Sequence, residues 1–189
     1  MKHATLRWAG ILLVSSGLLA GCGSVPPLKR ITLSPPQTDR VPARPSDWHV
    51  MRVQVPEYLD NYHLQVRSDA HVLSEVANAK WAIRLPVAMT QLLQQTIDEK
   101  LVQGRNKPYD VHVDVSTFEP QPGGTVVLAA QWRVTDNADT TVSRDTALIT
   151  QPLPARSGDN AEIIGQAMSN AVRELAMQIL AQTGQGVSS

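Results

Sequence analysis

Cysteine is almost absent from this sequence, since Cys22 is the only one in 189 residues. The chain can therefore form no intramolecular disulfide and offers no cluster of thiolates for a metal ion. Positive charge is not in excess either, because 17 Lys and Arg residues are balanced by 17 Asp and Glu residues. With no long block of either sign, this balance argues against a protein that binds nucleic acid.

Motifs of catalysis and metal binding are missing as well. The five histidines lie apart and none belongs to an H-E-x-x-H pattern, so the sequence indicates no metal site. It contains no G-x-S-x-G elbow, no P-loop and no G-x-G-x-x-G fingerprint. His112 and Asp114 share one face of a predicted strand, where they are most simply part of the solvated side of a sheet. We therefore predict that the protein is not an enzyme and has no cofactor other than a covalent lipid.

The clearest positive signal lies at the N-terminus. A short basic region precedes an apolar run over residues 8–19. The run is short for a membrane-spanning helix of roughly 20 residues and typical of the hydrophobic core of a signal peptide. It ends in LAGC at residues 19–22, the pattern that lipoprotein signal peptidase cuts before the cysteine. We therefore predict that residues 1–21 are removed and that the thiol of Cys22 is acylated.

The position of the single cysteine also predicts where the protein resides. Several acyl chains on Cys22 would hold it on a membrane almost permanently, since each buried CH₂ contributes about 0.8 kcal/mol. Under the usual bacterial sorting rule, an aspartate after the cysteine retains a lipoprotein in the inner membrane. The residue there is Gly23, which predicts the periplasmic face of the outer membrane. No second apolar segment is long enough to cross a bilayer, and the net charge after cleavage is about −2.

Proline separates the predicted anchor from the rest of the chain. Six of the 13 prolines lie in residues 25–47, where they fix φ and remove backbone donors, so this stretch is predicted to be extended. We predict a lipidated cysteine and tether over residues 22–47, with a short strand at 29–33. One periplasmic domain follows over 48–184, and a polar tail over 185–189.

Within the predicted domain the hydrophobic period changes between 2 and 3.6 residues. Alternation predicts strands at residues 50–55, 63–67, 71–76, 109–118, 125–135 and 141–150. Helical stripes predict two amphipathic helices, one over 85–101 and one from an N-cap at Asp159, with Glu162 three residues on, to a C-cap at Gly184. We predict an α+β fold: a mostly antiparallel sheet of about six strands, in two groups of three, packed with the two helices.

Several short motifs follow one another in an order shared with a known family. They are ITLSP at 31–35, VQVPEYLD at 53–60, KWA at 80–82, DVHVDV at 110–115 and AQW at 130–132. Through these motifs the chain resembles the PqiC (YmbA-like) family, over most of its mature length. That family comprises the auxiliary lipoproteins of ABC-type and MCE intermembrane transport systems. The lysine of KWA stands where the family usually has arginine, and lysine lacks the planar fork of a bidentate contact.

The resemblance implies a role without catalysis. Members of the family are outer-membrane lipoproteins that dock on a periplasmic MCE-domain protein anchored in the inner membrane. They help to complete a path for phospholipid between the two membranes. The resemblance also implies self-association into a ring. For the docking contact we expect Leu59, Asp60, Lys80 and Trp81, because all four lie near the ends of predicted loops.

A second hypothesis comes from a different class of protein. A lipid anchor, a tether and a domain without catalytic motifs also suit a structural or pilot-type lipoprotein that scaffolds another envelope machine. Neighbouring genes for an MCE protein and a permease would favour the transport role, and secretin genes would favour the scaffold. A tethered hydrolase is the third alternative, which a turnover abolished by one His or Asp substitution would support.

Overall fold

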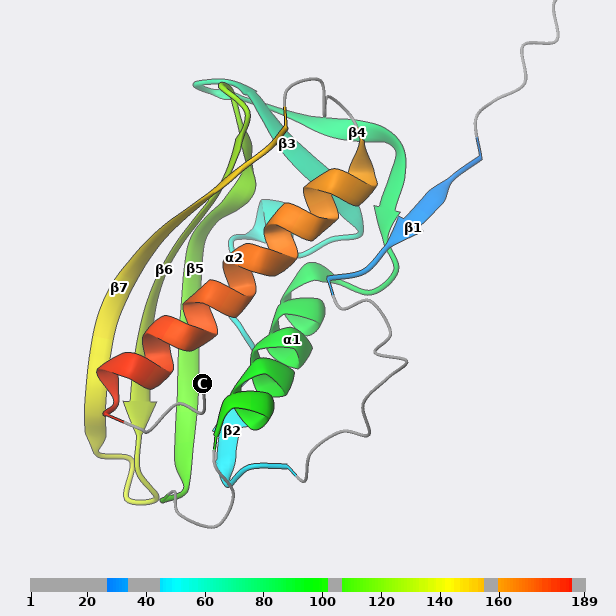
Figure 1. The fold of residues 1–189 in the computed structure, drawn as a ribbon. Coiled ribbons are helices and arrows are strands. Elements are labelled where there is room, and N and C mark those ends of the chain that lie inside the picture. The colour runs from blue at the N-terminus through cyan, green and yellow to red at the C-terminus, as the bar shows by residue number, and fades with distance from the viewer. Residues whose placement is uncertain (1–26, 34–44, 102–106, 155–159, 185–189) are drawn as a thin grey trace, which may run out of the picture.

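The computed structural model describes residues 27–33, 45–101, 107–154 and 160–184. Within them the chain forms an α+β domain, which confirms the predicted fold class (Figure 1). In chain order the elements are β1 (Lys29–Ile31), β2 (Trp48–Val50), the short 3-10 helix η1 (Glu57–Leu59), β3 (His63–Asp69), β4 (Val72–Trp81), α1 (Leu85–Lys100), β5 (Tyr109–Gln121), β6 (Thr125–Thr135), β7 (Thr141–Pro152) and α2 (Ala161–Gln182).

The strands form two sheets. Sheet A has three strands in the order β1-β4-β3, and sheet B has four in the order β2-β5-β6-β7. Neighbours within the hairpins are antiparallel, whereas β1 joins β4 and β2 joins β5 in parallel. The predicted grouping of three and three differs, since it placed β2 beside β3 and β4. Parallel partners can lie far apart in the sequence, so the periodicity of β2 does not reveal β5 as its neighbour.

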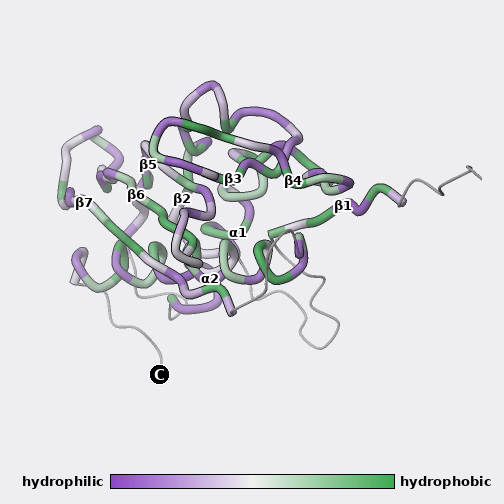
Figure 2. The backbone as a smooth tube through the Cα atoms, turned by 90° about the horizontal axis from the view of Figure 1, so that it is seen from above, coloured by the Kyte–Doolittle hydropathy of each residue, from purple (hydrophilic) through white to green (hydrophobic). Residues whose placement is uncertain are grey.

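Both helices lie on the same side of sheet B, as the view from above shows (Figure 2). α2 runs along β6 and β7 and reaches β1, while α1 packs against α2 and β2. None of the described helices is long and apolar enough to span a membrane. The residues of the two predicted stripes are buried, which confirms both helices: Leu85, Ala88, Met89, Leu92, Leu93, Ile97 and Leu101 in and directly after α1, and Ile164, Met168, Ala171, Val172, Leu175 and Ile179 in α2.

The polar face of α1 closes the free edge of β2. The backbone N–H of Val50 donates to Gln94 Oε1 at 2.8 Å, and Gln94 Nε2 donates to the carbonyl oxygen of Trp48 at 2.9 Å. One turn to either side along the helix, Thr90 and Asp98 accept further backbone N–H groups of the same segment at 3.0 and 2.9 Å. An open strand edge invites pairing with other chains. Here three polar side chains spaced four residues apart occupy it instead.

β4 is longer than predicted, because it continues through an irregularity to Trp81. Its register with β3 shifts between the pairs Gln65↔Glu75 and His63↔Lys80, and Asn78 takes a φ of 57°. A bulge of this kind breaks the alternation of buried and exposed side chains, which is why the pattern predicts a strand end at residue 76. Beyond the bulge Trp81 is buried and Lys80 is exposed.

α2 is capped by a different residue from the predicted one. The side chain of Asn160 accepts a hydrogen bond from the backbone N–H of Glu162 at 3.2 Å, so Asn160 is the N-cap. The predicted cap, Asp159, lies outside the described residues. At the other end Gly184 takes a φ of +70°, the left-handed conformation that commonly follows a helix, in agreement with the predicted C-terminal end.

The first described segment, residues 27–33, is fixed against α2. Leu33 is fully buried, and Ser169 Oγ lies 2.5 Å from the carbonyl oxygen of Leu33. One turn earlier in α2, a Cβ on Gly165 would stand only 3.9 Å from the Ile31 side chain and from the Thr32 carbonyl oxygen. The N-terminal segment therefore joins the body of the domain both through β4 and through α2.

Candidate docking surface

The four residues predicted for docking fall into two pairs. Leu59 and Trp81 are 3% and 1% exposed, so their side chains belong to the hydrophobic core and are closed to a partner in this structure. A turn and a strand each bury one residue and expose its neighbour, and the predicted contact of Leu59 and Trp81 with a partner stays a prediction. Asp60 is half-buried and Lys80 is exposed, and their contact with a partner stays a prediction.

The turn that carries Asp60 is held by proline and by the core. Pro56 has a φ of −58°, the value that its ring imposes. The backbone N–H of Leu59 donates to the carbonyl oxygen of Pro56 at 2.9 Å, which closes η1. Leu59 then inserts into the core, and the next residue, Asp60, is left at the surface. The segment PEYLD thus forms a rigid turn with its leucine inside and its terminal acid outside.

Two arginines from different elements flank Asp60. Arg52 follows β2, and Arg84 is the N-cap of α1. A guanidinium nitrogen of each lies 3.6 Å from a carboxylate oxygen of Asp60, longer than the roughly 2.7–2.9 Å of a charge-assisted hydrogen bond. Asp60 Oδ1 is buried and accepts no hydrogen bond from any described residue. We call Arg52, Asp60 and Arg84 the Asp60 cluster.

Lys80 belongs to a basic row that crosses sheet A. It is the register partner of Arg30 in β1 and of His63 in β3, and such partners lie on the same face of a sheet. His63 is paired with Glu75, whereas Arg30 and Lys80 are exposed and form no ion pair with a described residue. Like charges directly opposite each other are destabilising, by roughly 0.2–1 kcal/mol. No ion pair within the described chain offsets this repulsion.

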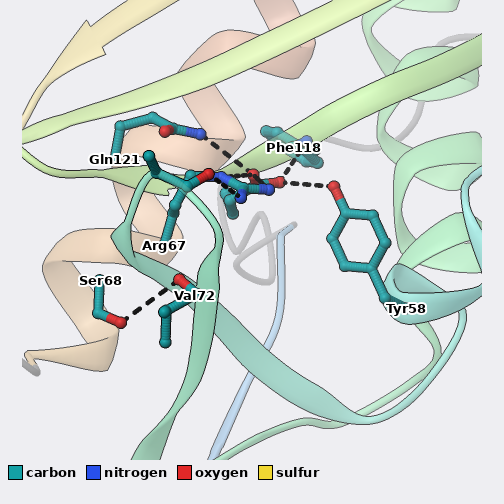
Figure 3. A network of polar contacts seen from close by, with 8 residues as sticks. Tyr58, Arg67, Ser68, Val72, Phe118 and Gln121 are labelled. Carbon is teal, nitrogen blue, oxygen red and sulfur yellow. Dashed lines mark hydrogen bonds and ion pairs between the residues drawn. The ribbon is translucent and has the colours of Figure 1, made fainter.

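A buried carboxylate joins sheet A to sheet B (Figure 3). Glu119 of β5 is fully buried. Its oxygens accept hydrogen bonds from Arg67 of β3 at 2.8 Å, from the Tyr58 hydroxyl and the Phe118 backbone N–H at 3.0 Å, and from Gln121 Nε2 at 3.1 Å. A buried carboxylate without partners would cost several kcal/mol, so this set of donors is what permits Glu119 there. The hairpin of β3 and β4 is fastened to sheet B at this point.

The surroundings of Glu119 alter the titration of its donors. Burial and the adjacent negative charge raise the pKa of Tyr58 to about 12. The hydrogen bond to Glu119 raises the pKa of Arg67 as well. Both groups therefore keep their protons at any physiological pH. Sequence reasoning missed this network, and its only local signal was an acid directly after the apolar end of a predicted strand.

The face of sheet B that points away from the helices carries a second basic row. His112, Arg133 and Arg144 are register partners on β5, β6 and β7, and both arginines are exposed. An open hollow of about 520 Å³ lies along this part of the sheet, lined by Asp114, Gln131, Trp132, Arg133, Arg144, Asp145 and Thr146. Its two acids balance its two arginines, so the hollow favours no particular ligand charge.

The described residues bring together no groups with an evident catalytic chemistry. No three His, Asp, Cys or Glu side chains of the described segments gather where they could hold a metal ion. His112 and Asp114 lie on the outer face of sheet B as expected, half-buried and exposed respectively. The described surface carries ion pairs and charged side chains without ion-pair partners instead.

Comparisons with known proteins agree with both the fold and the motifs. The chain is similar over 82% of its length to 99% of an uncharacterized protein in a crystal structure, with a TM-score of 0.61 and 14% identity. It is also similar to protein XCC0632 from Xanthomonas campestris, with a TM-score of 0.59 and 18% identity over 84% of this chain and 94% of that one. At such identities these likenesses show a common fold. No curated protein matches the chain.

A match to a family model says more about the chain than these likenesses of fold. It describes the ABC-type transport auxiliary lipoprotein component, and it matches residues 31–180. The match runs from the end of β1 almost to the end of α2, so it includes both sheets, the Asp60 cluster and the Glu119 network. The resemblance seen in the motifs is thereby confirmed. The chain belongs to the family of ABC-type transport auxiliary lipoprotein components.

Proposed function

We propose that the chain is a docking component of an MCE-type intermembrane lipid transport system, anchored through Cys22 to the periplasmic face of the outer membrane. The observation that carries the proposal is the family match over residues 31–180, which ties the chain to an ABC-type transport system. The lipoprotein signal supports the lipid anchor at Cys22, and Gly23 supports the outer membrane as its location. In this role the protein binds an MCE-domain partner anchored in the inner membrane, and phospholipid passes without chemical change.

The Asp60 cluster is the surface best suited to contact the partner. Its three residues come from separate segments whose backbones are fixed by η1, by β2 and by the start of α1. Arg52, Asp60 and Arg84 keep 57%, 34% and 48% of their side-chain surface exposed. Charges of both signs in one rigid patch give an interface specificity and orientation more than raw affinity. Both ion pairs are long, at 3.6 Å, so the two guanidinium groups and the exposed part of the Asp60 carboxylate are left to contact charged groups of the partner.

We propose in addition that several copies assemble into a ring around the transport path. β7 is the last strand of sheet B, so one of its edges has no strand partner among the described elements. Leu148 on this strand is 75% exposed. An edge strand can pair with a second chain, and a head-to-tail contact repeated around an axis closes a ring.

The proposal is tested by a mild-detergent pull-down of the lipidated protein from native envelopes, with mass spectrometry of the recovered proteins and lipids. Recovery of an MCE-domain protein together with enriched phospholipid supports the transport role. Recovery of secretin-type or other envelope machinery without an MCE protein overturns it and supports the structural scaffold instead.

The docking surface is tested separately with Asp60→Asn, which keeps the volume of the side chain and removes its charge. We expect about a tenfold loss of recovered MCE partner, the lower end of what one hydrogen bond to a charged group contributes. The matched control is Asp69→Asn, because Asp69 is an exposed acid at the end of β3. Full recovery of the partner with Asp60→Asn would remove the Asp60 cluster from the interface and leave the family role intact.

A further inference from the structure

Arg30 and Lys80, the basic side chains of sheet A without ion-pair partners among the described residues, lie beside the point where the predicted tether reaches the domain. Arg30 belongs to β1, the first described strand, and faces Lys80 across the parallel pair with β4. Both side chains are exposed, and so is Leu28, which is 50% exposed just before the strand. Trp81, on the opposite face of β4, is buried. The Arg30–Lys80 pair therefore points away from the core on the strand pair that the tether enters.

The length of the chain confines this pair to the neighbourhood of the predicted anchor. Lys29, where β1 begins, lies seven residues after Cys22. A fully extended chain spans at most about 3.6 Å per residue, so Lys29 stays within about 25 Å of the acylated cysteine. Because β1 is held by β4 and by α2, sheet A as a whole is kept near the membrane that holds the acyl chains.

We propose that the Arg30–Lys80 pair rests on the anionic phospholipid surface in which Cys22 is anchored, and so sets the orientation of the domain. The inference depends on the proposed lipidation of Cys22. Anionic headgroups supply the counter-charge that no described residue of the chain gives to Arg30 or Lys80. Each basic side chain near an anionic surface shifts the balance about fivefold toward the bound state, so the pair shifts it about 30-fold. A short tether makes this attraction intramolecular, which raises its effect without new contacts.

This orientation accounts for the way in which the molecule is laid out. β1 lies at one side of the molecule, and the turn between β6 and β7 lies at the opposite end (Figure 1). With sheet A on the membrane, the far ends of the long strands of sheet B project into the periplasm. The like-charged pair of Arg133 and Arg144 lies on those strands, remote from the tether in sequence. It provides a control with the same charge and the same cross-strand geometry.

The test uses the full lipidated chain reconstituted in vesicles. Tyr62 is 48% exposed and adjoins Trp81 in the ladder of sheet A, so Tyr62→Cys, labelled with a fluorophore, reports the distance from sheet A to headgroup-labelled lipid. We expect higher energy transfer on vesicles with about a third phosphatidylglycerol than on pure phosphatidylcholine. The difference should vanish at about 1 M salt, where the screening length is about 3 Å.

The decisive variants are R30E/K80E and R133E/R144E in the Tyr62→Cys background. The first should lower transfer on anionic vesicles to the phosphatidylcholine level, and the second should leave it high. R30Q/K80Q, which removes charge without adding acid, should give an intermediate loss and guards against a folding defect in the double reversal. Equal transfer on both lipids in the parent protein, or loss only in R133E/R144E, overturns the inference. Loss of MCE recovery in R30E/K80E with unchanged transfer would also overturn it and make the pair a protein contact.

The failure of the anchor and the failure of this inference give different results. Co-flotation with vesicles measures the anchor alone. A chain that does not float with either lipid refutes acylation of Cys22, and the proposed localisation with it. A chain that floats equally well with both lipids, but whose transfer is insensitive to phosphatidylglycerol, keeps its anchor and refutes only the orientation by Arg30 and Lys80.

Discussion

Sheet A and sheet B are held in the domain by different kinds of contact. Sheet B packs one face against two helices, and its first strand is closed by three polar side chains of α1. Sheet A buries Leu64, Val76, Ala79 and Trp81 in the same hydrophobic core, and it is fastened further by the bond of Ser169 to Leu33 and by the Glu119 network. Apolar burial divides stability over many residues, whereas a buried ion network makes it depend on a few. We therefore expect the loss of one member of the Glu119 network to destabilise the domain more than the loss of one polar contact elsewhere.

The same difference separates the proposed roles of the two sheets. Sheet A contains β1, the first described strand, and carries the Arg30–Lys80 pair, while sheet B supplies the long strands on the far side. If Cys22 is anchored as proposed, a force on it is transmitted to sheet A first, through β1, and then to the core through α2. The Glu119 network thus lies between the proposed membrane-facing part and the remainder of the domain, where it keeps their relative orientation.

The largest expected effect is that of Glu119→Gln. The substitution keeps the shape but leaves Arg67, whose side chain is 23% exposed, without its counter-charge. Breaking a buried ion pair typically costs about 3–5 kcal/mol, so we expect the free energy of unfolding in urea to fall by about 3 kcal/mol. The matched control is Glu75→Gln in the exposed pair with His63, which should change it by less than about 1 kcal/mol. Equal effects of the two substitutions would show that the buried network between the sheets stabilises the domain no more than an exposed ion pair.

Local patterns in the sequence were sufficient for most of sheet B and for both helices. The alternation in β5, β6 and β7 and the stripes of α1 and α2 reflect burial on one side of each element, which neighbouring residues encode. The pairing of β1 with β4 and of β2 with β5 joins segments about 50 and 60 residues apart, and no local period records it. The bulge at Asn78 hides the end of β4 for the same reason, since it interrupts the period itself.

The candidate site was predictable only in part. The acid of PEYLD and the base of KWA could be found from motifs, and both lie at the surface. Their neighbours Leu59 and Trp81 are core residues, because a motif shows which residues stand together but not which way each side chain turns. Glu119 escaped prediction altogether. Its burial depends on Arg67, 52 residues earlier, and only the folded chain brings such partners together.

A smaller loss is expected from Gln94→Ala, which opens the edge of β2. It removes two hydrogen bonds to the backbone of Val50 and Trp48, worth about 0.5–1.5 kcal/mol each. Because water can reach an opened edge, we expect a fall of about 1–2 kcal/mol in urea and faster hydrogen exchange at the Val50 amide. Gln91→Ala, on the exposed face of the same helix, should leave both unchanged. Failure of Gln94→Ala to speed exchange would show that the core, not α1, protects β2.

A pH titration sharpens the comparison at Tyr58. Its pKa is raised to about 12 in the fold from about 10 in an unfolded chain, so the folded state favours the protonated phenol. The resulting stability is complete below pH ~10 and is lost as the pH rises through ~12. Tyr58→Phe lacks this titration. The difference in urea midpoint between parent and variant should therefore shrink between pH ~10 and ~12, and a constant difference would contradict a phenol hydrogen bonded to Glu119.

The smallest expected effect concerns the like-charged pairs, and its sign matters more than its size. Lys80→Glu replaces a repulsion across from Arg30 by an attraction, and Arg144→Glu does the same across from Arg133. Exposed pairs contribute about 0.2–1 kcal/mol, so each variant should unfold at a slightly higher urea concentration than the parent. Suppose that Lys80→Glu raises the free energy of unfolding in solution and also abolishes the preference for anionic vesicles. The lysine of the parent protein then lowers the stability of the domain while it promotes contact with the membrane. That outcome would be hard to explain unless the charge acts on something outside the domain. A loss of stability would instead show that Lys80 already has a partner within the chain.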